Sequence, residues 1–258
     1  MKTWMTVACS LMAAAVFAEV PVITGNQNGA GAGFVKLTVA GGSETIVGVA
    51  FKDCMSVTAE ITLNDLVSTT GLPSAASAGE ANNAARLYVA NGTSYLTYYN
   101  KTGDGWTKFG DGTDAGLTRT VGDAVWLIMP GTSSTSYNVY VKGELVTSQS
   151  VTVSPGLNLI CAAKTEAYLL SALAVTSPNA GAKLMKSDYF LVPKIGEAAS
   201  AKYYYDASAS ATQGTAVFRT SGSSPTYWTA ATIPAGMGIW YYRSGDTSTT
   251  ITLAVAGE

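Results

Sequence analysis

Side chains that commonly carry catalysis are scarce in this sequence. Its 258 residues include no histidine, which removes the commonest general base and the usual nitrogen ligand of zinc. Serine and cysteine nucleophiles therefore lack their usual activating partner. Paired carboxylates can act without histidine in glycoside hydrolysis, but the acidic residues here are scattered along the chain. The sequence predicts no catalytic residue, no cofactor and no enzymatic activity.

One acidic, glycine-rich stretch, residues 104–114, carries the candidate metal ligands. Its Asp104, Asp111 and Asp114 offer carboxylate oxygens of the kind that bind calcium. Their spacing does not match a regular calcium-binding loop, and the corresponding part of the second half of the chain lacks the acids. We expect a solvated loop here and no metal site.

Aromatic residues are the other candidates for contact with a ligand or partner, because Trp and Tyr supply large and rigid surfaces. Trp126 and Trp240 alternate with aliphatic residues in strand-like runs, so we expect both in the core. The candidate exposed contact residues are Trp106, Tyr204 and Tyr227. Tyr204 lies in a run of three tyrosines, where strand geometry points neighbours to opposite faces and at least one outward.

These residues must be positioned by a sequence pattern that occurs twice, which we call the repeated skeleton. Residues 122–131 contain Gly122 and Trp126, and the same spacing returns 114 residues later at Gly236 and Trp240. The offset also holds near the start of each copy, whereas it slips between these anchors as expected for loops. We infer a tandem duplication, with a first repeat over residues 31–144 and a second repeat over residues 145–258.

Short β-prone runs with period-two alternation fill both repeats, separated by Gly, Asn, Asp and Pro. They lie at residues 34–39, 45–51, 86–89, 95–99, 124–129, 137–141, 151–153, 157–162, 189–192, 202–206, 216–219, 238–242 and 251–255. Helical spacing is confined to a short helix or turn at residues 62–67, capped by Thr62, and to residues 168–175. The sequence predicts an all-β protein of two tandem antiparallel modules, each a sandwich or a barrel with one short helix or helical turn.

The N-terminus predicts export. Residues 1–18 combine Lys2, an apolar run and small residues at a cleavage position, as in a secretory signal peptide. A permanent membrane anchor is the alternative, but the run is shorter than the roughly 20 residues that a spanning helix needs. We expect the mature chain to begin at Glu19 and to have no membrane span.

Residues 19–30 form an N-terminal arm that has no duplicate. Its first part is β-prone and its second part resembles a flexible linker. Val20, Val22, Ile23 and Thr24 are the residues expected to contact a neighbouring strand. The arm either docks on its own chain or is donated to another copy by β-augmentation.

Charge indicates which classes of partner the chain can bind, and the cysteines indicate whether a disulfide can form. Loss of Lys2 with the signal changes the formal net charge from -2 to -3, and charged residues make up 12% of the chain, about half the roughly 25% usual for globular domains. No basic face for nucleic acid or an anionic membrane is indicated. Cys54 and Cys161 would remain after cleavage, and they either form a bridge between the repeats or are two buried small side chains.

The second repeat also carries family-like motifs. It opens with residues 156–160 (GLNLI), contains residues 187–190 (SDYF), and closes with residues 233–243 (IPAGMGIWYYR). It resembles a widespread β module of secreted bacterial proteins, with a G-x-N-L-I opening and a P-x-G-x-x-x-W closing. It is especially similar to an uncharacterised family of exported bacterial β proteins that carries the module twice.

The likeness is weaker in the first repeat, where residues 43–46 (SETI) replace the opening and residues 120–121 (TV) replace the Ile-Pro step. The resemblance implies export, β structure and no established catalysis. It transfers no functional residue, because its motifs are structural.

Together these observations predict a non-enzymatic, secreted or cell-surface structural protein. A self-assembling subunit of an extracellular filament or surface coat, a homo-oligomer or polymer joined through the arm, is the first hypothesis. The alternative is an adhesion module that binds a glycan or a surface protein through exposed tyrosines.

Overall fold

The computed structural model describes residues 18–19, 32–53, 60–91, 94–110, 117–145, 148–162, 164, 167–193, 200–213 and 215–254. The arm residues Val20, Val22, Ile23 and Thr24 lie outside these ranges, as does Cys54.

The first repeat forms a large sheet, a small sheet and a two-stranded ribbon, with all strand pairs antiparallel. The large sheet has, in spatial order, β3 (Glu44–Gly48), β10 (Ala124–Ile128), β6 (Arg86–Asn91), β7 (Ser94–Lys101) and β8 (Gly105–Lys108). The small sheet has β1 (Ala18–Glu19), β2 (Ala32–Ala40), β11 (Ser136–Leu145) and β4 (Phe51–Lys52). The ribbon pairs β5 (Glu60–Thr62) with β9 (Thr118–Thr120).

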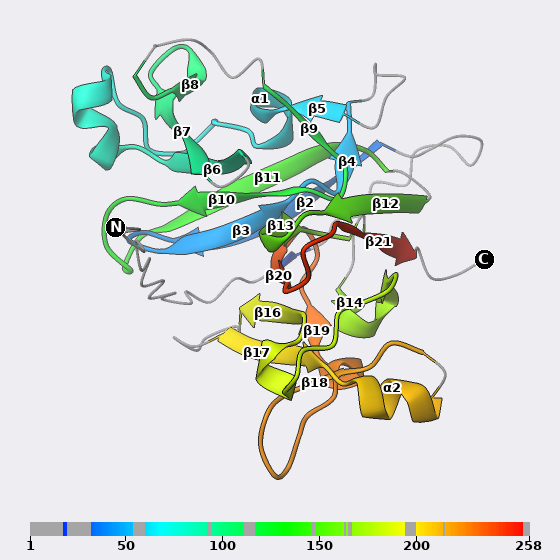
Figure 1. The fold of residues 1–258 in the computed structure, drawn as a ribbon. Helices are drawn as coiled ribbons and strands as arrows, with labels where there is room; N and C mark the ends of the chain where they lie inside the picture. The colour runs from blue at the N-terminus through cyan, green and yellow to red at the C-terminus, as the bar shows by residue number, and fades with distance from the viewer. Residues whose placement is uncertain are drawn as a thin grey trace, which may run out of the picture.

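The second repeat forms an equivalent large sheet and ribbon, and a small sheet of three strands. Its large sheet has β13 (Gly156–Ile160), β20 (Ile239–Arg243), β16 (Tyr189–Pro193), β17 (Ser200–Tyr205) and β18 (Phe218–Arg219). Its small sheet has β12 (Ser148–Val153), β21 (Thr249–Ala254) and β15 (Leu173–Val175), and its ribbon pairs β14 (Tyr168–Leu169) with β19 (Thr232–Ile233). The two large sheets therefore agree strand by strand in order along the chain and in space (Figure 1).

The expected all-β class is confirmed, and the described sheets pack as open sandwich layers instead of closing into barrels. Period-two alternation explains why these segments become strands. In β2, Val35, Leu37 and Val39 are fully buried, whereas the residues between them are partly exposed. They share one core cluster with Val139 of the neighbouring strand β11 and with Leu127 of β10 in the large sheet, which places the core between the small and large sheets.

Helices are short. They are α1 (Leu63–Leu66), α2 (Ala207–Gln213) and the 3-10 turns η1 (Ala78–Asn83), η2 (Leu170–Ala172), η3 (Leu184–Lys186) and η4 (Trp228–Ala230). The expected cap of α1 is present, because the Asp65 N–H donates to Thr62 Oγ1 at 3.2 Å. The helical expectation for residues 168–175 is wrong except at η2, since β14 and β15 occupy the flanks.

Helix α2 was not expected from the sequence. Asp206 caps it, because its Oδ1 accepts hydrogen bonds from the N–H groups of Ser208 and Ala209 at 3.0 and 3.1 Å. The acidic stretch also departs from the expected loop, since Gly105–Lys108 form strand β8.

Candidate functional site

The repeated skeletons of the two repeats meet each other at a junction. The Gly48 N–H donates to the Gly236 carbonyl at 2.8 Å, and the Cys161 N–H donates to the Gly122 carbonyl at 2.7 Å. Gly122 and Gly236 are equivalent in the duplication. Strand register makes Gly48 and Cys161 equivalent as well, because Val47 before Gly48 pairs with Val125, and Ile160 before Cys161 pairs with Ile239. The two hydrogen bonds are thus the same contact made twice, once in each direction.

Two isolated β-bridges are likewise one contact made twice, between equivalent residues of the two repeats. Val47 bridges Met237, and Asp123 bridges Ile160, both antiparallel. The two large sheets therefore contact each other through backbone at the junction while remaining separate sheets. The arrangement has the approximate two-fold character of an isologous dimer interface, although both sides belong to one chain.

Glycine permits this close approach. A Cβ atom on Gly48 would lie 2.5 Å from the Cβ of Cys161, and one on Gly236 would lie 2.8 Å from Cγ1 of Val35. One on Gly238 would lie 2.5 Å from the Cβ of Ala124. Real Cβ atoms do not approach other carbons so closely, so larger residues here would force the repeats apart.

An aromatic face covers the outer side of both large sheets at the junction. We define it as Tyr88, Tyr95, Trp126, Tyr189, Tyr204, Trp240 and Tyr242, which strand register places on the same sides. The equivalent residues Trp126 and Trp240 meet edge to face, with ring centroids 6.2 Å apart. Such pairs are worth about 0.5–1.5 kcal/mol beyond their buried area.

Exposure differs along the aromatic face. Trp240 is buried as expected, and Trp126 is partly buried. Tyr95 is 40% exposed, and its ring contacts those of both tryptophans with centroids 6.3 and 6.5 Å away. On the second large sheet, Tyr189 stacks on Tyr242 at 4.9 Å.

Two of the three residues expected to be exposed contacts are buried. The expectation for Trp106 is wrong, because its side chain is fully buried and its Nε1–H donates to the Val67 carbonyl at 2.8 Å. The expectation for Tyr204 is also wrong, since neighbouring Tyr189 covers its ring at a centroid distance of 5.4 Å. Tyr227 is 41% exposed and lies outside the aromatic face.

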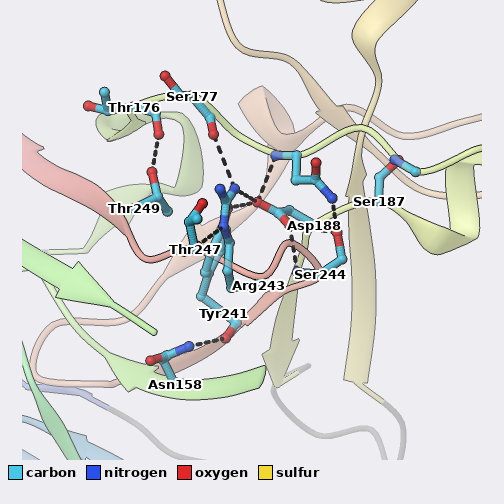
Figure 2. Close-up of polar contacts among 12 residues, drawn as sticks. Asn158, Thr176, Ser177, Ser187, Asp188, Tyr241, Arg243, Ser244, Thr247 and Thr249 are labelled. Carbon is cyan, nitrogen blue, oxygen red and sulfur yellow. Dashed lines mark hydrogen bonds and ion pairs between the residues drawn. The ribbon is translucent and has the colours of Figure 1, made fainter. Parts of the chain in front are cut away.

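The most elaborate polar group in the described chain is centred on Asp188, directly before β16 (Figure 2). Its Oδ2 accepts hydrogen bonds from Tyr241 Oη–H at 2.6 Å and from Arg243 Nη1 at 2.8 Å. The other oxygen, Oδ1, accepts from the backbone N–H and the hydroxyl of Ser244 at 2.7 and 2.9 Å. The Asn179 N–H also donates to Oδ2.

No side-chain atom of Asp188, Tyr241 or Arg243 is among the buried polar atoms that lack a hydrogen-bond partner. Arg243 donates its remaining contacts to the carbonyls of Thr247 and Ser177 at 2.9 and 3.1 Å. Burial opposes ionisation, but the hydrogen bonds from Asn179, Tyr241, Ser244 and Arg243 outweigh it and lower the pKa of Asp188. Burial raises the pKa of Tyr241, as does its bond to the carboxylate. With its acceptors occupied, Asp188 has a structural role.

The first repeat fills the same positions with apolar side chains. Ala85 precedes β6 as Asp188 precedes β16, and Leu127 and Met129 stand 114 residues before Tyr241 and Arg243. The backbone confirms the equivalence, because the Ala85 and Asp188 N–H groups donate to the carbonyls of Pro73 and Asn179 respectively. All three residues of the first repeat are buried.

Cys161 is a buried free thiol at the junction. Burial, and then the nearby Asp123 carboxylate, raise its pKa above the ordinary value. The thiol is therefore protonated at neutral pH and is poorly suited to act as a nucleophile. Its side chain fills the space that Gly48 leaves open.

Within the described residues, no group of three or more His, Cys, Asp or Glu is placed to hold a metal ion. No helix in the described part of the chain has the length and apolar character needed to cross a membrane. Comparison of the chain with models of protein families, with curated proteins and with solved structures finds no match.

The Asp188 network predicts asymmetric effects of substitution. Asp188→Ala alone leaves Arg243 and Tyr241 buried without their partner and should lower the free energy of unfolding by about 3–5 kcal/mol. The triple change to the first repeat's residues, Asp188→Ala with Tyr241→Leu and Arg243→Met, should cost much less, because apolar groups replace the whole buried set. Urea denaturation followed by circular dichroism measures both.

The exposed ion pair of Lys101 and Asp104 provides the control. Asp104→Ala should leave the denaturation midpoint unchanged. A triple variant as unstable as Asp188→Ala would contradict the interpretation that a polar and an apolar set of buried side chains can replace each other at these positions.

Proposed function

We propose that the protein is a non-enzymatic, exported structural subunit that assembles with copies of itself into an extracellular filament or surface coat. The observation that carries the proposal is the place of Glu19 at the outer edge of β2. Glu19 pairs with Lys36, and Ala18 pairs with Leu37. The predicted cleavage after Ala18 would make Glu19 the first residue of the N-terminal arm.

The edge of β2 is suited to accept a strand. On its inner side β2 pairs with β11 along its whole length, from Ala32 to Ala40. On its outer side the described residues provide β1, which pairs with β2 at two positions. A long strand with such an edge can bind another extended segment through its main-chain N–H and C=O groups.

Sequence features support the same proposal. The arm is β-prone at its start and has no duplicate, so it is available for a role outside the repeats. Low charge reduces the repulsion between copies that high net charge would cause. The resemblance of the second repeat to modules of exported bacterial proteins supports a location outside the cell.

Deletion of residues 19–25 tests the arm. The shortened chain, purified without any unfolding step, should stay monomeric in light scattering at concentrations where the full mature chain forms assemblies, because the donated strand is missing. A synthetic peptide of residues 19–25, added in excess, should also block assembly of the full mature chain by occupying the edge of β2.

A peptide of the same composition in scrambled order is the matched control and should not block assembly. Unchanged tryptophan fluorescence of the shortened chain would show that its repeats are folded. Assemblies that persist without residues 19–25 would exclude the arm as the connector.

A second candidate function is adhesion to a glycan, and the aromatic face favours it. Tyr95 presents an exposed ring beside Trp126 and Trp240. Aromatic side chains offer flat apolar surface together with a polar tip, a combination suited to a ligand that is apolar on one side and polar at its edges. Any ligand on Tyr95 would alter the surroundings of two indoles.

Titration with soluble polysaccharides tests this candidate through tryptophan fluorescence. Binding at the aromatic face should change the emission, and Tyr95→Ala should weaken the response by removing about 1–2 kcal/mol of contact. Tyr227→Ala is the matched control, since Tyr227 is equally exposed but lies elsewhere. A response that both variants retain in full would place the ligand away from the aromatic face.

A further inference from the structure

We infer that the junction between the repeats also forms between two copies of this chain, with the first repeat of one copy pairing with the second repeat of another. The inference rests on the proposed self-assembly but uses a contact separate from the N-terminal arm. Its partner is a second copy of this chain, and its surface is the repeated skeleton with the ends of β3 and β13.

Few backbone contacts join the two repeats, whose side chains share one core. Within the described residues, every sheet other than the one joined by β1 takes its strands from a single repeat, and the boundary between the repeats falls at the end of β11. Contacts between the repeats are therefore side-chain packing and the few backbone contacts of the junction. The chain crosses from one repeat to the other once, between Leu145 and Ser148. A second repeat from another copy would meet the same surface.

The approximate two-fold relation raises the question of which repeats can pair. In an isologous interface the equivalent residues face each other, so two first repeats would place Gly48 against Gly48, and two second repeats would place Cys161 against Cys161. The observed pair is mixed. A Cβ on Gly48 would lie 2.5 Å from the Cβ and 2.8 Å from Sγ of Cys161, so the space at this point holds one side chain.

This fit favours pairing of a first repeat with a second repeat over pairing of two like repeats. Two glycines would leave a void, which costs stability, and two cysteines would overlap. Pairing of two first repeats would also place the carboxylate of Asp123 against Val47, where Met237 now lies. Specificity therefore comes both from the good fit of the mixed pair and from the poor fit of like pairs. Copies joined in this way form reciprocal dimers or head-to-tail chains.

Cysteine pairing across the Val47–Met237 bridge tests the inference. The hydrogen bonds from Gly48 N–H to Gly236 and from Gly238 N–H to Ile46 flank this bridge. They make Val47 and Met237 a non-hydrogen-bonded pair, with Cα atoms about 4.5 Å apart in typical sheets. That separation lies within the range that a disulfide spans.

Two chains are prepared, one carrying Val47→Cys and the other Met237→Cys, both lacking residues 19–25 and carrying Cys54→Ser. They are unfolded in denaturant, mixed, and refolded together under mild oxidation. Non-reducing electrophoresis should show a covalent dimer that contains one of each chain. Its fraction should rise with chain concentration, because pairing within one chain competes at a fixed effective concentration. Each chain refolded alone should give no such dimer.

Two controls make the result decisive. A single chain carrying both Val47→Cys and Met237→Cys should form an internal disulfide, which shows that the geometry permits the bond. A mixture of the Val47→Cys and Asp123→Cys chains reports on pairing of two first repeats and should give no dimer.

The inference is overturned if the doubly substituted chain forms its internal bond while the mixture gives no dimer at any concentration. A dimer from the Val47→Cys and Asp123→Cys mixture would overturn the selection of unlike repeats. Because both chains lack the arm, failure here leaves the strand-donation proposal standing. Failure of that proposal in the deletion experiment likewise leaves the junction untouched.

Discussion

The close approach of backbone at the junction is the constraint on which the rest of the structure depends. A glycine at position 48 lets the Cys161 side chain fill the space between the two large sheets. With the sheets at this distance, the paired hydrogen bonds from Gly48 and Cys161 can form, and Trp126 can meet Trp240. The same approach brings Gly236 against Val35, so that the two repeats share a single core. Two modules that could each have a separate core are therefore parts of one packed body.

The duplication shows how one fold tolerates different chemistry at equivalent positions. The second repeat buries Asp188 with Arg243 and Tyr241, whereas the first repeat buries three apolar side chains in their place. A buried ion pair is weak evidence for stability, because the desolvation of both charges offsets their attraction. Its hydrogen bonding matters more, since no side-chain atom of Asp188, Tyr241 or Arg243 is among the buried polar atoms without a partner.

Much of the fold could be predicted from sequence because its strands alternate with period two. The spacing of Gly122 and Trp126 against Gly236 and Trp240 indicated equivalent strands, and these are β10 and β20. That the two copies contact each other could not be predicted, since an internal repeat does not reveal how its copies pack. Once the contact is known, the paired glycines of the closing motif explain it.

The exposure of single residues was harder to predict. Trp106 lies in a glycine-rich acidic segment that is typical of a loop, yet Asn64 Oδ1 accepts its backbone N–H at 2.8 Å and holds it in β8. Helix α2 has a composition of Ala, Ser and Thr with little helical signal. Asp206 before it was the available cue. In the Asp188 network the cue was Arg243, a charged residue that ends an otherwise aromatic and aliphatic strand.

A double-mutant cycle on Gly48 and Cys161 tests most directly whether the junction governs the stability of the whole chain. The measurement is the free energy of unfolding in urea, followed by both tryptophan fluorescence and circular dichroism. Gly48→Ala should destabilise the protein, and adding Cys161→Gly should recover part of the loss by vacating the space. The coupling energy should fall in the range of about 0.5–3 kcal/mol found for residues in contact. Additive effects of the two substitutions, or a Gly48→Ala variant as stable as the parent chain, would contradict the account.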